Sequence, residues 1–396
     1  MVIPWFACIW YLLWYFSLWP YHLRSQPETE PFRCIMYLTG QHNVVPEKDL
    51  VADITHVILA FMHSDVFNVD DTPSEFPLFT TVEEVRSRLV PGTNVTVAIG
   101  GWGDNDGFAV AAKSDASRKR WAKQVAVMVE QVGADGVDVD WEYPGGNRDD
   151  YKQTPNSERE SEIEAFVSLI EALRGALSPG KLLSIAVPGK EVDLMAFTPS
   201  TVPRIMKQVD FLNVMTYDLM NRRDTVTKHH SGVSDSRDAI QRYISRGASP
   251  HKINLGLGYY VKWFMTQECN IDDPRGCPTQ LMEDPKTGAD LGKTGAFSWH
   301  DEVPQDLVES FARAQAKGNY DEDGSYYHWD SQEWRWWSFD TAKSIRRKLQ
   351  DVVPQLGVGG AFAWGLGEDA PQFEHLKATI EGVRKHRGAG ITKGEL

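Results

Sequence analysis

The sequence has few of the features that mark nucleic-acid-binding, metal-binding and repeat proteins. Its 41 Lys and Arg residues are outnumbered by 55 Asp and Glu residues, which gives a formal net charge of −14. Nucleic acids and anionic membranes bind clustered basic side chains, so neither is expected as a partner. The chain has only 4 cysteines, and no set of Cys and His residues has metal-site spacing. The His229-His230 pair lies in a polar stretch and is predicted to be a surface feature. We therefore expect neither a metal nor a cofactor.

The N-terminal segment is almost wholly apolar, and residues 1–21 carry no charged side chain. This pattern predicts a targeting segment over residues 1–24, either a cleaved signal peptide or an uncleaved membrane anchor. The sequon Asn94-Val95-Thr96 is consistent with entry into the secretory pathway. The chain ends in a predicted polar tail, residues 386–396, whose last four residues resemble the K-D-E-L retrieval signal. An extracellular location is therefore expected, with retention in the endoplasmic reticulum as the alternative.

Two cysteines lie close together, Cys269 and Cys277, in a loop rich in Asp, Pro and Gly. In an oxidising compartment these two can form a disulfide. Closing so short a loop contributes about 2.5 kcal/mol to stability by the chain-entropy estimate. The remaining cysteines are Cys8, in the targeting segment, and Cys34, at the start of the first predicted strand.

Short apolar runs rich in β-branched residues alternate with longer amphipathic stretches, which is typical of repeated β/α units with a parallel sheet. Eight runs are predicted to be strands: 33–38, 56–61, 94–100, 136–140, 183–187, 211–215, 253–258 and 360–364. The clearest predicted helices are 114–132, 156–177, 236–246, 339–350 and 371–384. Eight such units predict one α/β domain, a (β/α)8 TIM barrel, with its active site at the carboxyl ends of the strands. The interval 259–337 is too long for an ordinary loop and predicts an inserted subdomain.

Three carboxylates stand at two-residue spacing among apolar residues in the run D-G-V-D-V-D-W-E-Y-P, residues 135–144: Asp138, Asp140 and Glu142. On a strand this spacing places all three on one face, while the intervening apolar residues face the packed helices. Like charges this close cannot all ionise cheaply. At least one carboxylate should therefore keep its proton near neutral pH and serve as a general acid.

This run resembles the D-G-x-D-x-D-x-E signature of glycoside hydrolase family 18, the chitinase family. Residues 215–218, M-T-Y-D, resemble the M-x-Y-D motif of the same family. The resemblance covers residues 32–385 and is strongest to fungal members. It implies that the insertion between strand 7 and helix 7, residues 259–337, is a small α+β subdomain. It also implies an endo-acting chitinase that cleaves β-1,4 bonds of N-acetylglucosamine polymers with retention.

The resemblance also implies a role for each site residue. Glu142 would protonate the glycosidic oxygen while the acetamido carbonyl of the substrate attacks the anomeric carbon. Asp140 would orient the acetamido N–H, Tyr217 would hold the carbonyl side, and Asp138 would share a proton with Asp140. The residues expected to bind substrate are Tyr37, Phe61, Trp102, Tyr143, Met215, Asp218 and Trp364.

One departure from the family pattern concerns strand three, where the family often has S-x-G-G and this chain has Ala98-Ile99-Gly100-Gly101. A serine hydroxyl that could steady the carboxylates is thus absent, which leaves the pH optimum open. Two other functions are compatible with the barrel: an endo-β-N-acetylglucosaminidase acting on N-glycans, and a non-hydrolytic chitin-binding lectin, against which Glu142 argues. We expect a monomer that binds chitin or chito-oligosaccharides, with a membrane contact only if the N-terminal segment is uncleaved.

Overall fold

The computed structural model describes residues 31–392. The predicted targeting segment and the K-G-E-L sequence at residues 393–396 lie outside the described residues. No helix within residues 31–392 is long and apolar enough to cross a membrane.

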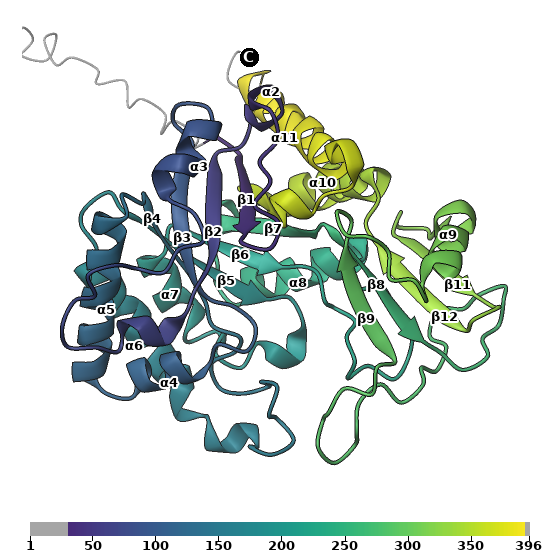
Figure 1. Cartoon of the computed structure of the whole chain (residues 1–396), viewed down its shortest axis with the longest axis horizontal. Helices are drawn as coiled ribbons and strands as arrows, with labels where there is room; N and C mark the ends of the chain where they lie inside the picture. The colour runs from purple at the N-terminus through teal and green to yellow at the C-terminus, as the bar shows by residue number, and fades with distance from the viewer. Residues whose placement is uncertain (1–30, 393–396) are drawn as a thin grey trace, which may run out of the picture. The chain divides into compact units, whose positions relative to one another are not determined.

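Eight parallel strands form a closed barrel in the order β1-β13-β7-β6-β5-β4-β3-β2 (Figure 1). Their bounds are β1 Arg33–Thr39, β2 His56–Met62, β3 Asn94–Gly100, β4 Gly136–Asp140, β5 Leu182–Pro188, β6 Phe211–Met215, β7 Ile253–Gly258 and β13 Gly360–Trp364. The predicted (β/α)8 fold is therefore confirmed, because every predicted strand is present and takes its place in the barrel. The predictions for β1, β2 and β5 ended one residue short at one or both ends.

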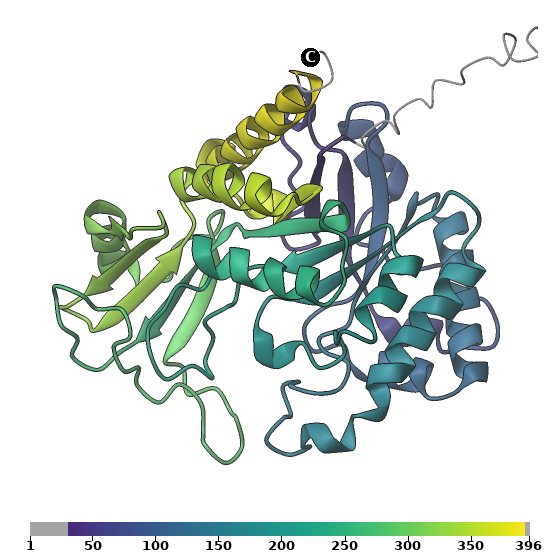
Figure 2. The same ribbon diagram turned by 180° about the vertical axis from the view of Figure 1, so that it is seen from behind.

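Helices cover the outer face of the barrel (Figure 2). They are α2 Lys48–Val51, α3 Val82–Arg88, α4 Asp106–Ala112, α5 Asp115–Gln131, α6 Ser161–Ala176, α7 Val202–Gln208, α8 Val233–Ser245, α10 Ala342–Leu356 and α11 Glu374–Thr392. The predicted start of a helix at Phe339 is wrong, because Phe339 ends a strand of the insertion. Thr341 caps α10 instead, and its hydroxyl accepts a hydrogen bond from the Ser344 N–H at 3.2 Å.

The predicted polar tail begins inside α11, which continues to Thr392. Arg387 holds this part of the helix to the barrel. Its guanidinium donates to the Phe32 carbonyl at 2.9 Å and pairs with the Asp53 carboxylate at 3.0 Å. Residues 386 and 387 are thus part of the folded domain.

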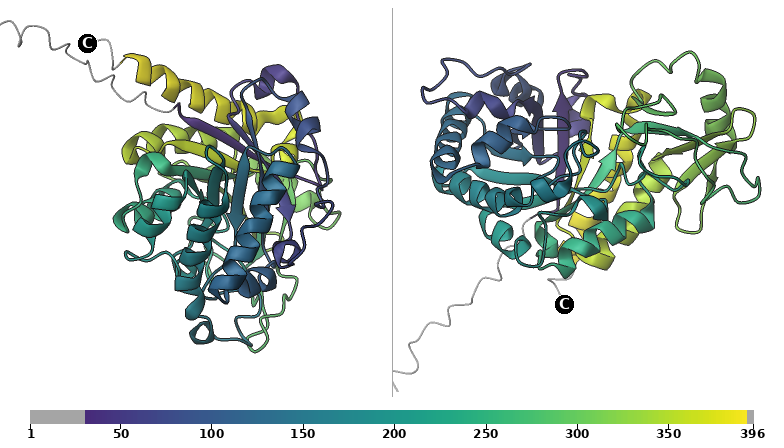
Figure 3. Two further views of the ribbon diagram at one scale, coloured as in Figure 1. Left: turned by 90° about the vertical axis from the view of Figure 1, so that its left-hand side faces the viewer. Right: turned by 90° about the horizontal axis from the view of Figure 1, so that it is seen from below.

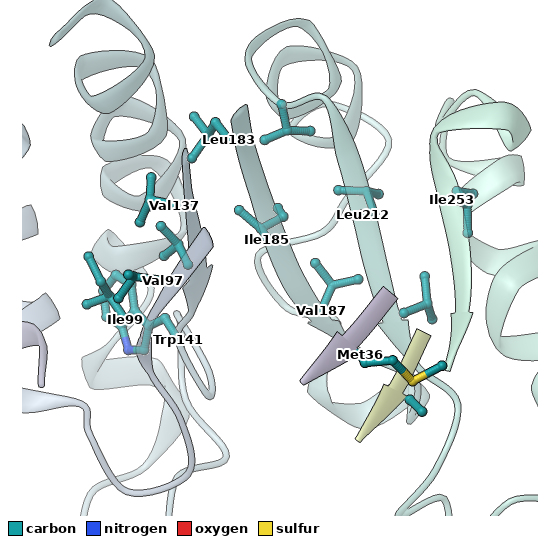
Figure 4. Close-up of a cluster of buried hydrophobic side chains, with 14 of the residues drawn as sticks. Met36, Val97, Ile99, Val137, Trp141, Leu183, Ile185, Val187, Leu212 and Ile253 are labelled. Carbon is teal, nitrogen blue, oxygen red and sulfur yellow. The ribbon is translucent and has the colours of Figure 1, made fainter. Parts of the chain in front are cut away.

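The main apolar core lies between the barrel strands and the helices. Val137, Val139 and Trp141 belong to this layer and are buried, as the alternation along β4 predicts. Figure 4 shows Val137 and Trp141 among the other core side chains. The Trp141 ring stacks on Phe108 of α4 with ring centroids 5.2 Å apart. Packing of this face against the helices directs the carboxylates of β4 into the barrel interior.

The insertion between β7 and α10 contains a five-stranded antiparallel sheet in the order β10-β11-β12-β8-β9. Its elements are β8 Tyr260–Met265, β9 Thr294–Ser298, α9 Val308–Lys317, β10 Asn319–Tyr320, β11 Tyr326–Asp330 and β12 Arg335–Phe339. This sheet stands beside the barrel in Figures 1 and 2 and in the right panel of Figure 3. The α+β insertion predicted for the fold is therefore present.

The insertion is attached to the β6–α8 loop, and a disulfide lies at the attachment. Cys269 and Cys277 are bonded, as predicted, with Cα atoms 5.5 Å apart. The Thr227 N–H donates to the Cys277 carbonyl at 2.8 Å. Cys34 is buried and unpaired in the described part of the chain.

The predicted surface position of His229 and His230 is wrong, because the insertion covers them. His230 is completely buried, its N–H donates to the Ser338 hydroxyl on β12 at 2.9 Å, and its ring packs on Tyr260. The Asn94 sequon also differs from expectation, since it lies within β3 and Thr96 is buried. A glycan acceptor needs an accessible loop, so this sequon gives no support for the secretory pathway.

Candidate active site

A cleft of about 1490 Å³ opens at the carboxyl ends of the barrel strands, with β9 of the insertion forming part of one wall. It is lined by most of the predicted site residues: Tyr37, Phe61, Trp102, Asp140, Glu142, Tyr143, Met215, Tyr217, Asp218 and Trp364. Asp138 lies beneath the cleft and is fully buried. The barrel thus brings together residues that are spread over more than 300 positions of the chain.

The carboxylate of Asp138 is held by hydrogen bonds from three other strands of the barrel, β1, β5 and β6. Its Oδ2 accepts from the Tyr37 hydroxyl at 2.8 Å, and its Oδ1 accepts from the Ser184 hydroxyl at 2.6 Å and the Asn213 amide at 3.4 Å. The next carboxylate, Asp140, is 3% exposed, and its Oδ1 has no hydrogen-bond partner among the described residues. Asp138 is therefore fixed, whereas Asp140 has an acceptor oxygen free for a ligand.

The three carboxylates of the site all hold protons more tightly than usual. Burial raises the pKa of Asp138 to about 6, although Ser184 and Tyr37 oppose this rise by hydrogen bonding. Burial, then the charges of Glu142 and Asp138, raise the pKa of Asp140 well above its ordinary value. Burial also raises the pKa of Glu142 to about 7, with the Tyr143 hydroxyl acting to lower it and the charges of Asp218 and Asp193 adding to the rise. A protonated Glu142 is therefore available near neutral pH.

The hydroxyl missing from strand three is supplied by β5. Ala98, Asp138 and Ser184 are consecutive partners across β3, β4 and β5. The serine that the family often has on strand three, where this chain has Ala98, thus has a counterpart in Ser184 on the other side of Asp138. Side chains alternate along the predicted strand 183–187, and Ser184 is at a position that faces the barrel interior. This alternation is the only signal in the sequence that could have identified Ser184.

The two glycines at the end of β3 allow close contact with β4 and with the cleft floor. A Cβ on Gly100 would lie 2.1 Å from the Asp140 carbonyl, and one on Gly101 would lie 2.6 Å from the Phe61 ring. The Gly101 N–H donates to the same Asp140 carbonyl at 2.8 Å. Both glycines also have positive φ angles, of +112° and +92°, so other residues would be strained there.

Aromatic rings form two platforms in the cleft. Trp364, at the end of β13, stacks on Phe61 with ring centroids 5.5 Å apart. A register shift between Leu59 and Met62 turns Phe61 toward the cleft, against the alternation of β2. The second platform is Trp102, which is 54% exposed and contacts the Tyr143 ring edge to face. Apolar faces of sugar rings pack on such side chains.

Tyr37 belongs to the cleft lining but presents little surface to it. It is only 1% exposed, and its hydroxyl is committed to Asp138. Its ring lies under Trp364 with centroids 5.7 Å apart. We therefore interpret Tyr37 as a support for Asp138 and for the Trp364 platform.

The insertion contributes two polar side chains that sequence reasoning missed. Lys262 and Tyr260, both on β8, donate to the Asp218 Oδ1 at 2.7 and 2.8 Å. Burial alone would raise the pKa of Asp218, but the positive charge of Lys262, together with the hydrogen bonds from Lys262 and Tyr260, outweighs burial and holds this pKa below its ordinary value. Asp218 is thus an anion beside Glu142. No signal in the linear sequence connects β8 with this aspartate.

No three His, Cys, Asp or Glu side chains within residues 31–392 converge in a way that could hold a metal ion. The chemistry of the cleft, as the structure describes it, is that of a protonated carboxyl group above a buried carboxylate pair, between two aromatic platforms. This arrangement can donate a proton to a bound polymer and stabilise positive charge next to it.

Comparison with known proteins agrees with this geometry. Residues 33–369 match the family described as Glycosyl hydrolases family 18. The chain is 24% identical over 371 residues to Probable chitinase 10 of Drosophila melanogaster, covering 87% of this chain and 15% of that protein. It is 26% identical over 316 residues to Chitinase 1 of Aphanocladium album, covering 75% of this chain and 65% of that one. The chain thus spans less than two thirds of the length of either relative.

A plant class V chitinase mutant from Cycas revoluta, solved in complex with (GlcNAc)3, has the same fold. Its TM-score is 0.65 at 21% identity, and the match covers 88% of this chain and 99% of that one. The family match extends over most of the barrel and includes both motifs of the site. Fungal proteins are among the relatives. The chain therefore belongs to glycosyl hydrolases family 18.

Proposed function

We propose that this protein is an endo-acting chitinase that hydrolyses β-1,4 bonds between N-acetylglucosamine units with retention of configuration. The observation that carries the proposal is the position of Glu142, at the end of β4 and above Asp140, with a pKa raised to about 7. The cleft also exceeds the roughly 300–1,000 Å³ of sites for drug-sized ligands, at about 1490 Å³. It can therefore hold several sugar units, as cleavage within a polymer requires.

In the proposed first step, Glu142 gives its proton to the glycosidic oxygen, and the bond from this oxygen to the anomeric carbon breaks. The acetamido carbonyl oxygen of the same sugar forms a new bond to that carbon. The free Oδ1 of Asp140 accepts the acetamido N–H, which aligns the carbonyl and stabilises the positive charge that develops. The sugar that carries this group packs on Trp364, and the leaving sugar lies on the Trp102 side.

Tyr217 acts as a hydrogen-bond donor in this step. Burial, then the charges of Asp140 and Glu142, raise the pKa of its hydroxyl well above the ordinary value. Because the hydroxyl stays protonated, it can donate to the acetamido carbonyl side. In the second step water gives a proton to Glu142 and attacks the anomeric carbon, which releases the acetamido group and restores the enzyme.

The product pattern tests the proposal. The protein should cut (GlcNAc)6 at interior bonds, and it should leave cello-oligosaccharides and a high-mannose glycopeptide intact. Cleavage of the glycopeptide alone would indicate an endo-β-N-acetylglucosaminidase, and binding of (GlcNAc)6 without cleavage would indicate a lectin. Comparable rates on cello-oligosaccharides would contradict the acetamido mechanism, because cellulose has no acetamido group.

We also propose that the protein enters the secretory pathway. The apolar segment at residues 1–24 and the Cys269–Cys277 disulfide support this location. If residues 393–396 act as a retrieval signal, their deletion should move the protein from the cell interior to the medium. Full secretion with these residues intact would exclude retention.

A further inference from the structure

A chain of hydrogen bonds crosses the interior of the barrel from its amino-terminal end to Asp138. We propose that Asn254 and Asn213 are positioning residues. Because Arg33 fixes the orientation of both amides, the Asn213 amide N–H is directed to Asp138 and Tyr37, which favours the anionic form of Asp138. This inference rests on the proposed function, because it concerns the carboxylates of that site. It adds Asn254, Asn213 and the Arg33 that orients them, which neither motif contains, to the residues that position the site.

The links of the relay are hydrogen bonds between buried groups, and the direct contact with Asp138 is the longest of them. The Arg33 Nε–H donates to the Asn254 Oδ1 at 2.9 Å, and the Asn254 amide donates to the Asn213 Oδ1 at 2.8 Å. The Asn213 amide donates to the Tyr37 hydroxyl at 3.0 Å and to the Asp138 Oδ1 at 3.4 Å. Both asparagines are completely buried, and Arg33 is also buried.

The direction of the relay follows from the chemistry of arginine. A guanidinium has five N–H donors and no acceptor, so Asn254 must present its carbonyl oxygen to Arg33. Its amide N–H then faces Asn213, which must present an oxygen in turn. The amide N–H of Asn213 is therefore left for Asp138 and Tyr37. Because Tyr37 accepts from Asn213, its own proton is directed to Asp138.

The strand register provides the path for the first link. Arg33, Gly360 and Asn254 are consecutive partners across β1, β13 and β7. A Cβ on Gly360 would lie 2.3 Å from the Asn254 Oδ1 and 2.7 Å from the Arg33 Cβ. Arg33 therefore reaches Asn254 across a strand position that has no side chain. Asn213 and Asn254 are direct partners between β6 and β7, which provides the second link.

Arg33 is held in place at the amino-terminal end of the barrel. Its guanidinium lies over the Phe211 ring, 5.2 Å from the centroid, and donates to the His251 carbonyl. Because these contacts restrain the guanidinium, its Nε–H stays in position to donate to the Asn254 Oδ1.

The surroundings of Asp138 show why donors matter there. The titratable groups that face it are Tyr37 from β1, Asp140 from β4 and Tyr217 after β6. The neighbouring strands β3 and β5 present Ala98 and Ser184, neither of which is charged. Within residues 31–392 no cation lies among these groups, so the anion of Asp138 depends on hydrogen-bond donors. An anionic Asp138 can share the proton of Asp140, which leaves the other Asp140 oxygen for the acetamido N–H.

The variant Asn254→Leu tests the relay, because it removes the link without adding charge. Asn213 then loses its fixed orientation, and the pKa of Asp138 should rise. The acidic limb of kcat/KM on chito-oligosaccharides should move to higher pH by about 0.5 unit or more, while the basic limb, set by Glu142, should stay. Thr96→Val is the matched control. Its hydroxyl is also buried in the barrel interior and has no hydrogen-bond partner among the described residues, so neither limb should move.

If the acidic limb of kcat/KM lies at the same pH in Asn254→Leu and in the unmodified protein, the proposal is wrong. Titration of Asp138 by NMR, with ¹³C-labelled aspartate and Asp138→Asn for assignment, gives a readout that needs no activity. If the unmodified protein cleaves no chito-oligosaccharide, the proposed function fails, and this titration still decides the relay. If Asn254→Leu does not fold, Arg33→Gln should shift the titration in the same direction, because a glutamine amide can donate or accept. An unshifted midpoint in folded Arg33→Gln would likewise refute the proposal.

Discussion

The hydroxyl of Ser184 on β5 donates to the carboxylate of Asp138 on β4 at 2.6 Å, on the side opposite Ala98 of β3. The family often has a serine on strand three for this support, and this chain has Ala98 there. In this barrel the donor comes from the neighbour on the other side, so the buried carboxylate still receives a hydroxyl. Ser184 therefore supplies a donor that opposes the rise in the pKa of Asp138 caused by burial.

Ser184→Ala should raise the pKa of Asp138, because the anion loses a donor while burial still opposes its charge. The acidic limb of the pH–activity profile should then move upward, and stability should fall by about 1.5–3 kcal/mol, as for hydrogen bonds to charged groups. Activity profiles and denaturant unfolding measure both effects. Adding Ala98→Ser to this variant should restore the pH profile at least in part. If Ser184→Ala leaves the acidic limb in place and Ala98→Ser also has no effect on it, the hydroxyl is not needed.

Glu142→Gln should reduce kcat by at least about 10²–10⁴-fold, because the amide cannot donate the proton that the leaving sugar requires. The shape of the cleft is preserved, so the affinity for (GlcNAc)6 should stay nearly unchanged. Calorimetric binding and a turnover assay on the same preparation separate the two effects. Turnover close to that of the unmodified protein would remove Glu142 from the role of general acid.

Activity should follow a bell-shaped pH profile. It should decline as pH rises through about 7, where Glu142 loses the proton it must donate. It should also decline as pH falls through about 6, where Asp138 becomes neutral. The kcat/KM on chito-oligosaccharides over pH 4–9 measures both limbs. A profile with a single limb would mean that one of the two carboxylates does not control the reaction.

The same two carboxylates should make the protein less stable as pH rises. Their folded-state pKa values are raised above the ordinary ones, so the folded state binds more protons than the unfolded state between these values. Their contribution to stability is therefore full below about pH 4 and is lost as pH rises through about 6 and 7. The unfolding free energy of Glu142→Gln should decline less steeply over this window than that of the unmodified protein. An identical slope would contradict the raised pKa of Glu142.

Lys262→Met should move the basic limb of activity to higher pH. Without the ammonium group, the negative charge of Asp218 is less balanced, and the pKa of Glu142 should rise further. Lys262→Arg keeps the charge and serves as the matched control, with an expected limb close to that of the unmodified protein. A limb that moves equally in both variants would point to packing rather than charge.

Local pattern was sufficient to predict the strands and to place the β4 carboxylates on one face. The β4 carboxylates share a face because side chains alternate along any strand, and this holds whatever the strand packs against. Most strand bounds were also predicted correctly, since short apolar runs between turn residues can be read without knowing their neighbours. Glu142, Asp140 and Tyr217 follow from two such runs together with the resemblance to the family.

The partners of these residues were decided only by the tertiary structure. Ser184 lies 46 positions from Asp138, and Lys262 lies 44 positions from Asp218. These contacts depend on strand register and on where the insertion meets the barrel, and neither is visible as a local pattern. The burial of His230 has the same cause, because a sheet from a distant segment covers a polar loop. Phe61 reaches the cleft through a register shift between β2 and β3. The hydrogen bonds from Arg33 to Asp138 form only because closure of the barrel places Gly360, which has no side chain, between Arg33 and Asn254.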